Sequence, residues 1–124
     1  MIKIILLVLV AEIFTAIGQI LLKVSANAAD LYNLRRLDAH ARFLADVFAN
    51  PAVWGGFLAM GLGLVSWIFA LAQGDLSLVF SLGSLQYVLI LFGAHIFLGE
   101  KIDRMKFLGT FLVVFGIILI TMSR

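Results

Sequence analysis

Residues 4–26 have the sequence IILLVLVAEIFTAIGQILLKVSA, the first of several long apolar segments in the chain. About 20 apolar residues cross the hydrocarbon region of a bilayer as a helix, so this segment is long enough to span a membrane. Three residues with charged or amide side chains interrupt it: Glu12, Gln19 and Lys23. On a helical projection Gln19 and Lys23 lie within about 20° of Glu12, so the three side chains form one stripe.

The polar stripe indicates more than a membrane anchor. An ionisable residue at bilayer depth costs about 2.5 to 3.5 kcal/mol on insertion scales, and it usually faces the interior of a helix bundle or a wet cavity. A helix that only anchored the protein would gain nothing from these side chains. We therefore expect the stripe to bind a substrate or to couple its movement.

The composition is that of an integral membrane protein. Of the 124 residues 64% are hydrophobic and 13% are charged, whereas soluble domains have about 25% charged residues. Cysteine is absent, which excludes a disulfide framework and a thiolate metal site. The net charge of +2 is small and the basic residues lie at the ends of apolar runs, so we expect no nucleic-acid partner.

Four apolar runs have the length of a membrane-spanning helix, at residues 4–26, 52–72, 76–98 and 106–122. They do not alternate apolar and polar residues, as the strands of a transmembrane barrel do. The later connections are short, which predicts antiparallel neighbours. The sequence therefore predicts an all-α membrane protein, a single domain with four transmembrane helices.

The polar segment 30–50 has apolar residues at steps of three and four, which predicts an amphipathic helix on the membrane surface. There Arg35, Arg36 and Arg42 would lie near lipid phosphates. A solvated connector is the alternative. Pro51 follows it and is suited to the first turn of the second span.

Lysine and arginine are distributed unequally between the two sides of the membrane. One side carries seven of them, Lys23, Arg35, Arg36, Arg42, Lys101, Arg104 and Lys106, and the other carries two, Lys3 and Arg124. The positive-inside rule then places both termini outside and the surface helix in the cytoplasm. We expect a multi-pass protein of the bacterial inner membrane with a fixed orientation.

The third span has a polar face. Ser77, Ser81, Ser84 and His95 project within about 40° of a common direction, and Gln86 projects the other way. Each serine alternatively bonds only to a carbonyl one turn back. The span has no proline, so any bend must come from Gly83 or the serines.

Two other spans have small residues that allow close helix contact. The second span has a face with two glycines, formed by Gly56, Met60, Gly63 and Trp67. In the fourth span Gly109 and Gly116 are seven residues apart and nearly on one face. We predict that this second pair of glycines lies at a dimer interface.

The motifs of the chain resemble those of the drug/metabolite transporter superfamily, in particular its four-helix flippase subunits for undecaprenyl-phosphate-linked aminoarabinose. The resemblance rests on Gly18-Gln19-x-x-x-Lys23, Ser81-Leu82-x-Ser84-Leu85-x-Tyr87, Leu98-Gly99-Glu100-Lys101 and the span from Gly109 to Gly116. It covers nearly the whole chain except the surface helix. Gln19 and Lys23 match the flippase pattern, and Glu12 does not.

The resemblance implies a dimer, either of two identical chains or of two related four-helix chains. Its first three helices would line a substrate chamber and its fourth would pair the subunits. Such flippase subunits move a lipid-linked sugar from the cytoplasmic to the outer leaflet. No enzyme activity and no cofactor are implied, and the chain has no metal-ligand spacing, phosphate-binding glycine loop or nucleophile–base pair.

A proton-coupled exporter of cationic drugs is the second hypothesis, because the chain is also similar to small multidrug resistance transporters. When Lys23 is matched to their lysine, their membrane glutamate falls on Thr15, and Glu12 lies one turn earlier. Their substrate-stacking aromatic residues fall on Val79 and Leu82, which removes stacking surface for an aromatic cation. Drug export is therefore ranked second.

The residues of the stripe suggest a mechanism for moving a lipid-linked head group. Lys23 would attract the phosphate of the substrate, together with Arg35, Arg36 and Lys101. Glu12, about 16 Å deeper at 1.5 Å per residue, would pair with an amine on the sugar or carry a proton. Alternatively, Lys23 only snorkels to the head groups and Glu12 only pairs with a second subunit.

Four further side chains would provide hydrogen bonds along the path: Gln19, Ser81, Ser84 and Tyr87. A third hypothesis comes from another class of protein, a non-transporting accessory subunit of a membrane enzyme. The glycine faces fit that hypothesis equally well, but Glu12 in the bilayer does not.

Overall fold

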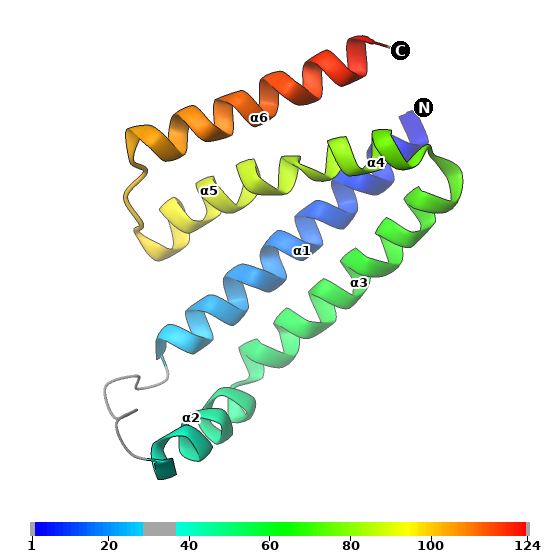
Figure 1. Ribbon diagram of the computed structural model, residues 1–124. Helices are drawn as coiled ribbons and strands as arrows, with labels where there is room; N and C mark the ends of the chain where they lie inside the picture. The colour runs from blue at the N-terminus through cyan, green and yellow to red at the C-terminus, as the bar shows by residue number, and fades with distance from the viewer. Residues whose placement is uncertain (1, 29–36, 124) are drawn as a thin grey trace.

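The computed structural model describes residues 2–28 and 37–123, and its regular elements within these ranges are helices (Figure 1). In chain order they are α1 (Ile2–Ala28), α2 (Leu37–Ala49), α3 (Pro51–Gln73), α4 (Leu76–Gly83), α5 (Leu85–Leu98) and α6 (Arg104–Met122). α1, α3, the pair α4 and α5, and α6 are each long and apolar enough to cross a membrane. The predicted fold class, an all-α membrane protein with four transmembrane helices, is confirmed.

The start of α1 and the end of α6 lie at the same end of the helix bundle. Figure 1 shows the N-terminal end of α1 and the C-terminal end of α6 at one end of the bundle, with the α3–α4 connection. The C-terminal end of α1, α2 and the α5–α6 connection lie toward the other end. This arrangement agrees with an even number of crossings.

Local signals in the sequence set the helix ends. The side chain of Asn50 accepts a hydrogen bond of 3.0 Å from the Ala52 amide, and Pro51 is the first residue of α3, as predicted. Gly99 ends α5 in the left-handed conformation, with φ of 66°. Asp103 caps α6 by accepting a bond of 2.7 Å from the amide of the next residue.

The longest helix contact is between α1 and α3, and glycines make it close. A Cβ atom added to Gly18 would lie 2.7 Å from the carbonyl oxygen of Gly56, and one added to Gly63 would lie 2.9 Å from the carbonyl oxygen of Ala11. Real Cβ atoms do not approach other atoms this closely, so only glycine fits. The small face predicted for the second span therefore packs against α1.

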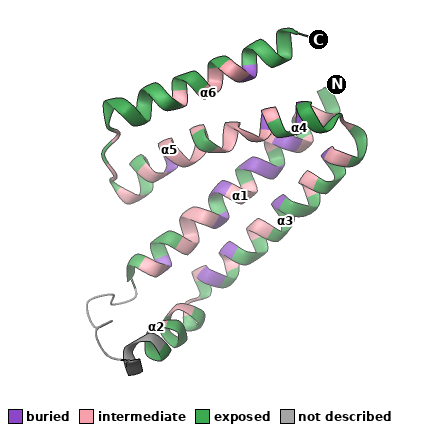
Figure 2. Ribbon diagram, viewed as in Figure 1, coloured by how far each residue is buried: buried purple, intermediate pink, exposed green. Residues whose placement is uncertain are grey.

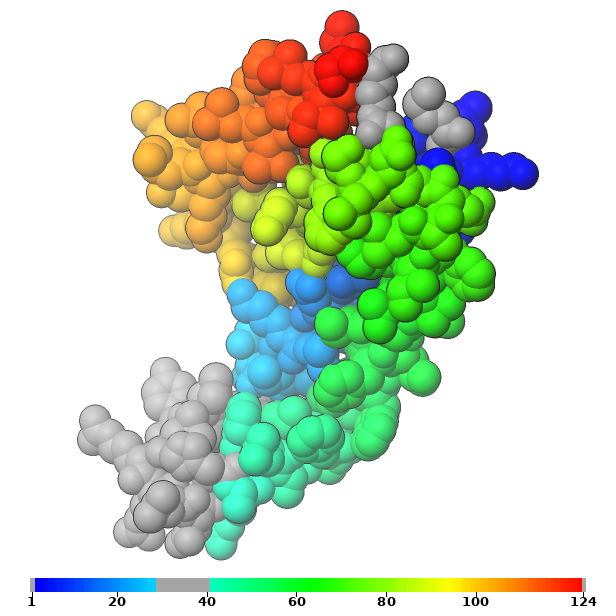
Figure 3. Space-filling view, turned by 45° about the vertical axis from the view of Figure 1, so that its right-hand side comes forward, coloured from blue at the N-terminus to red at the C-terminus, as the bar shows by residue number. Residues whose placement is uncertain are grey.

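The buried core joins α1, α3 and α4. Val8, Ala70 and Val79 are fully buried there, and Ile117 adds a contact from α6. Figure 2 shows the buried residues on α1, α3 and α4, whereas α6 is mostly exposed. In the space-filling view the orange and red atoms of α6 lie on the outside of α4 and α5 (Figure 3).

The third span is broken near its middle. α4 ends at Gly83 and α5 begins at Leu85, with Ser84 in a turn between them. The Ser84 amide bonds to the Ser81 carbonyl at 3.2 Å, and the Tyr87 amide bonds to the Ser84 carbonyl at 3.1 Å. Both bonds span three residues, which tightens the helix locally. The break falls where the sequence offers Gly83 and the serines as the source of a bend.

α2 covers the C-terminal part of the predicted surface helix. It contacts the start of α3, where the indole Nε1 of Trp54 donates a hydrogen bond of 3.0 Å to the Phe48 carbonyl. Arg42 is exposed, and Arg35 and Arg36 lie outside the described residues. The position of α2 on the membrane surface stays a prediction.

We predict that Gly18→Ala destabilises the bundle by about 1 to 3 kcal/mol, because the new methyl group forces α1 and α3 apart. The matched control is Gly55→Ala on α3, where an added Cβ meets only Leu21 Cδ1 at 3.9 Å. Unfolding in mixed micelles, followed by circular dichroism, measures both variants. Equal stability of the two would contradict the close packing of α1 on α3.

Candidate functional site

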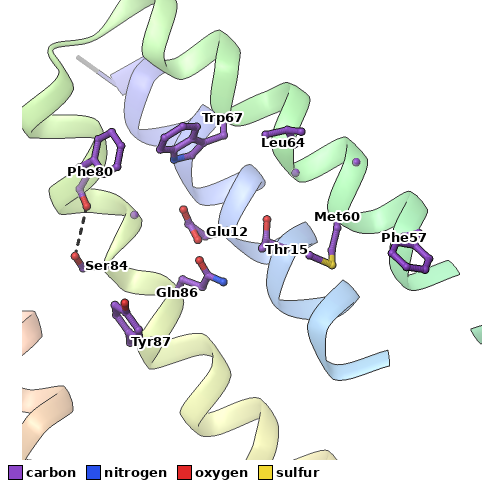
Figure 4. Close-up of a pocket in the computed structure, with 13 residues that line it drawn as sticks. Glu12, Thr15, Phe57, Met60, Leu64, Trp67, Phe80, Ser84, Gln86 and Tyr87 are labelled. Carbon is purple, nitrogen blue, oxygen red and sulfur yellow. Dashed lines mark hydrogen bonds between the residues drawn. The ribbon is translucent and has the colours of Figure 1, made fainter. Parts of the chain in front are cut away.

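A pocket of about 650 Å³ lies between α1, α3 and the broken third span. Its walls include Glu12 and Thr15 of α1, Trp67 of α3, and Ser84 and Gln86 at the break (Figure 4). Three of the four spans therefore contribute to the pocket.

Glu12 is the most unusual residue of the pocket. The residue is only 4% exposed. Among the described residues, its Oε2 is the only buried side-chain nitrogen or oxygen that has no hydrogen-bond partner. Buried polar groups are normally paired, because desolvation without a partner costs free energy. The geometry therefore leaves one carboxylate oxygen for a group that the described residues do not supply.

A glycine allows α4 to approach Glu12. A Cβ atom added to Gly83 would lie 3.3 Å from Oε1 of Glu12 and 3.9 Å from Nε1 of Trp67. A side chain at position 83 would therefore fill the space beside the carboxylate. Figure 4 shows Gln86 of α5 also pointing toward Glu12.

Residues from both sides of the helix break lie at the pocket. A regular helix would point Gln86 away from Ser84, as the sequence analysis predicted. In the structure Gln86 and Ser84 line the same pocket. Their side chains nevertheless point in different directions, as the helical projection predicts: Gln86 points toward Glu12, and Ser84 bonds to the Phe80 carbonyl (Figure 4).

Aromatic side chains form another part of the wall. The rings of Trp67 and Phe80 meet edge to face, with centroids 5.0 Å apart and an interplanar angle of 81°. Tyr87 and Phe57 also line the pocket and are 66% and 48% exposed. The sequence pattern predicts a packing role for Trp67. Its position one turn after Gly63 fits a packing role and a pocket wall equally well, so the sequence holds no separate signal for the site.

The other predicted residues of the path are divided between the pocket and its surroundings. Ser84 and Tyr87 are among the described residues that line the pocket, whereas Gln19 and Ser81 are not. Both serines bond to a carbonyl one turn back, Ser81 to Ser77 at 2.6 Å and Ser84 to Phe80 at 3.4 Å. These are the local bonds that were the alternative to substrate binding.

Lys23 lies at the far end of the predicted stripe, near the end of α1. Its ammonium group forms an ion pair with Glu100 in the α5–α6 connection. This hydrogen bond, with the charges of Lys23 and Lys106, holds the pKa of the Glu100 carboxyl below its usual value. Nδ1 of His95 donates to the backbone carbonyl of Glu100 at 2.8 Å, since a carbonyl can only accept.

The remaining predicted residues lie outside the pocket. Lys101 is exposed in the α5–α6 connection. On α6, a Cβ atom added to Gly109 or Gly116 would meet nothing within 4 Å, so both glycines face open space. The described part of the chain has no group of three acidic or histidine side chains placed to hold a metal ion.

Comparison with known proteins gives the family. The profile of the EamA-like transporter family matches residues 43–122. The probable 4-amino-4-deoxy-L-arabinose-phosphoundecaprenol flippase subunit ArnE of Yersinia pseudotuberculosis serotype O:1b (strain IP 31758) is 32% identical over 116 residues, which are 94% of each chain. The protein of the same name in Yersinia pestis (strain Pestoides F) has the same identity and coverage.

The protein with that name in Pseudomonas aeruginosa (strain UCBPP-PA14) is 27% identical over 117 residues, which are 94% of this chain and 96% of the relative. No solved structure matches the chain. These similarities confirm the resemblance predicted from the motifs. The chain is a multi-pass membrane protein that belongs to the EamA-like transporter family.

Proposed function

We propose that the chain is a subunit of a flippase that moves a polyprenyl-phosphate-linked amino sugar across the inner membrane. One observation carries the proposal: the buried Oε2 of Glu12 has no partner within residues 2–28 and 37–123, and it lies in a pocket between three spans. A carboxylate there favours a cationic group, and an amino sugar has one. The names of the relatives, which specify a 4-amino-4-deoxy sugar on phosphoundecaprenol, support this chemistry.

The neighbours of Glu12 suit a sugar that carries an ammonium group. Gln86 points toward the carboxylate and has both donors and acceptors for sugar hydroxyls. Trp67 offers an aromatic face, and a cation on such a face gains about 0.5 to 2 kcal/mol. Ser84 and Tyr87 lie at the same pocket and would bind the rest of the head group.

The two charged residues of α1 would act one after the other. Glu12 and Lys23 are 11 residues apart, about 16 Å along the helix at 1.5 Å per residue. We propose that Lys23, with Arg35, Arg36 and Lys101, meets the phosphate at the cytoplasmic surface. The sugar then moves inward past Gln19 to Glu12, and the polyprenyl chain stays in the bilayer.

The distribution of basic residues supports one orientation of the chain. Seven lysines and arginines are assigned to the end that contains α2 and the α5–α6 connection, against two at the end with the termini. The proposal places the first end in the cytoplasm, where lipid-linked precursors are made available to Lys23.

A second chain is part of the proposal, because the relatives are named as subunits. α6 is the span with the smallest buried share, and the glycine pair Gly109 and Gly116 faces open space on it. We propose that this surface pairs with another four-helix chain, either identical or related.

Proton-coupled export of organic cations is the second candidate. The observation that favours it is the aromatic wall of Trp67, Phe80 and Tyr87 around the Glu12 pocket. Sequence matching placed the stacking positions at Val79 and Leu82, which are buried in the core, so the aromatic surface comes from other residues.

We predict that Glu12→Gln slows translocation of the amino-sugar lipid about 10- to 100-fold in reconstituted vesicles. The variant loses a charged contact worth about 1.5 to 3 kcal/mol. Thr110→Val on α6, far from the pocket, is the control and keeps the wild-type rate. Head groups accessible on the outer leaflet are counted with an impermeant amine reagent.

The same vesicles separate the two candidate functions. If Glu12 recognises the amine, a lipid whose sugar amine is acetylated is moved equally slowly by the wild type and by Glu12→Gln. Proton-driven uptake of an aromatic cation, lost in Glu12→Gln while lipid translocation persists, would contradict the flippase proposal in favour of drug export.

We predict that single cysteines report the proposed orientation, because the chain has no cysteine of its own. An impermeant maleimide added to intact cells labels Gln73→Cys, at the end of α3, and labels Arg42→Cys on α2 only after permeabilisation. Both native side chains are exposed, so accessibility is matched. Equal labelling of the two in intact cells would rule out a fixed orientation.

A further inference from the structure

The ion pair between Lys23 and Glu100 joins two distant parts of the chain. The residues are 77 positions apart, one near the end of α1 and the other between α5 and α6. The pair therefore ties the end of α1 to the α5–α6 connection, at the end of the bundle away from the termini.

The pair is open to solvent. The side chain of Lys23 is 49% exposed and that of Glu100 is 39% exposed. Ion pairs with this exposure contribute little to stability, because water screens both charges. An incoming anion can therefore replace the carboxylate on Lys23 without a large loss.

The backbone of Glu100 is held independently of its carboxylate. Gly99 turns the chain in the left-handed conformation, and His95 Nδ1 donates to the Glu100 carbonyl at 2.8 Å. The Glu100 amide also bonds to the Ala94 carbonyl at 3.3 Å. The side chain of Glu100 can leave Lys23 while its backbone stays in place.

Positive charge predominates around the carboxylate. Lys106, at the start of α6, acts on the Glu100 carboxyl together with Lys23, and Lys101 is the next residue in the chain. The carboxylate of Asp103 accepts a hydrogen bond from the backbone amide of Arg104, the first residue of α6. Removing Glu100 from Lys23 would leave a group of cations suited to a phosphate, for which lysine acts as a point charge.

We propose that the Glu100 carboxylate occupies the phosphate site in the unloaded protein, and that the phosphate of the lipid substrate displaces it from Lys23. Displacement exchanges one anion for another on Lys23 and at the same time frees the end of α1 from the α5–α6 connection. Substrate binding thereby opens the path from Lys23 toward the Glu12 pocket. The inference rests on the proposed function, since it takes the substrate to be a lipid phosphate.

Binding of polyprenyl phosphate without a sugar tests the displacement. In zwitterionic vesicles, Glu100→Gln is expected to lower the Kd about two- to fivefold, because the lipid no longer competes with an internal anion. Lys23→Gln is expected to raise it. The double variant Lys23→Glu, Glu100→Lys restores an ion pair with the charges exchanged. If the pair is only structural, this variant binds like the wild type, and that result would overturn the proposal.

A distance measurement tests the release of α1. Spin labels on cysteines at Asn27 and Ile102, one on each side of the pair, report the separation of α1 from the α5–α6 connection. Polyprenyl phosphate is expected to lengthen this distance, and polyprenol is expected to leave it unchanged. In the Glu100→Gln variant the distance is expected to be long even without lipid. An unchanged distance at saturating polyprenyl phosphate would refute the release. Lengthening by inorganic phosphate at the same concentration would assign the site to a free anion instead of a lipid.

Translocation measured on the same samples separates this inference from the proposed function. If the amino-sugar lipid is translocated while the spin-label distance stays constant, the displacement is wrong and the flippase function stands. If the distance responds to polyprenyl phosphate but no lipid-linked sugar is translocated, the phosphate site stands and the flippase function is wrong.

Discussion

The structure depends on one constraint, a carboxylate held inside a membrane bundle. Glu12 is almost fully buried, and its Oε2 has no partner among the described residues. Placing such a group in hydrocarbon is unfavourable, and the fold surrounds it with the broken third span and with α3. Gly83 leaves room beside the carboxylate, and the close glycine packing of α1 on α3 brings Trp67 to the same pocket.

The fold was predictable because it depends on length and local chemistry. Four apolar runs of sufficient length require four spans, and Pro51, Gly99 and Asp103 mark helix ends through their backbone and side-chain preferences. The family motifs are local as well. Glu12 was recognisable as a candidate site residue from the sequence alone, because a charged residue inside a long apolar run is energetically unfavourable and usually has a functional role.

The composition of the site was less predictable, because it depends on contacts between helices. Helical periodicity places Gln86 away from Ser84, yet both residues line the pocket, and the sequence does not show which of them faces Glu12. The pairing of Lys23 with Glu100 joins residues 77 positions apart, and no pattern within one helix indicates it. Trp67 shares a face with glycines, and that face fits a packing role and a pocket wall equally well.

The central claim is that the Glu12 carboxylate binds the amine of a lipid-linked sugar. The chain has only two glutamates, so Glu100→Gln leaves Glu12 as the single glutamate and allows its carboxyl carbon to be labelled alone. Solid-state NMR then measures dipolar coupling between this ¹³C and a ¹⁵N amine on the lipid-linked sugar. The account predicts a direct coupling, at the distance of an ion pair of about 4 Å or less between nitrogen and oxygen. A bound substrate whose amine shows no coupling to Glu12 would contradict it.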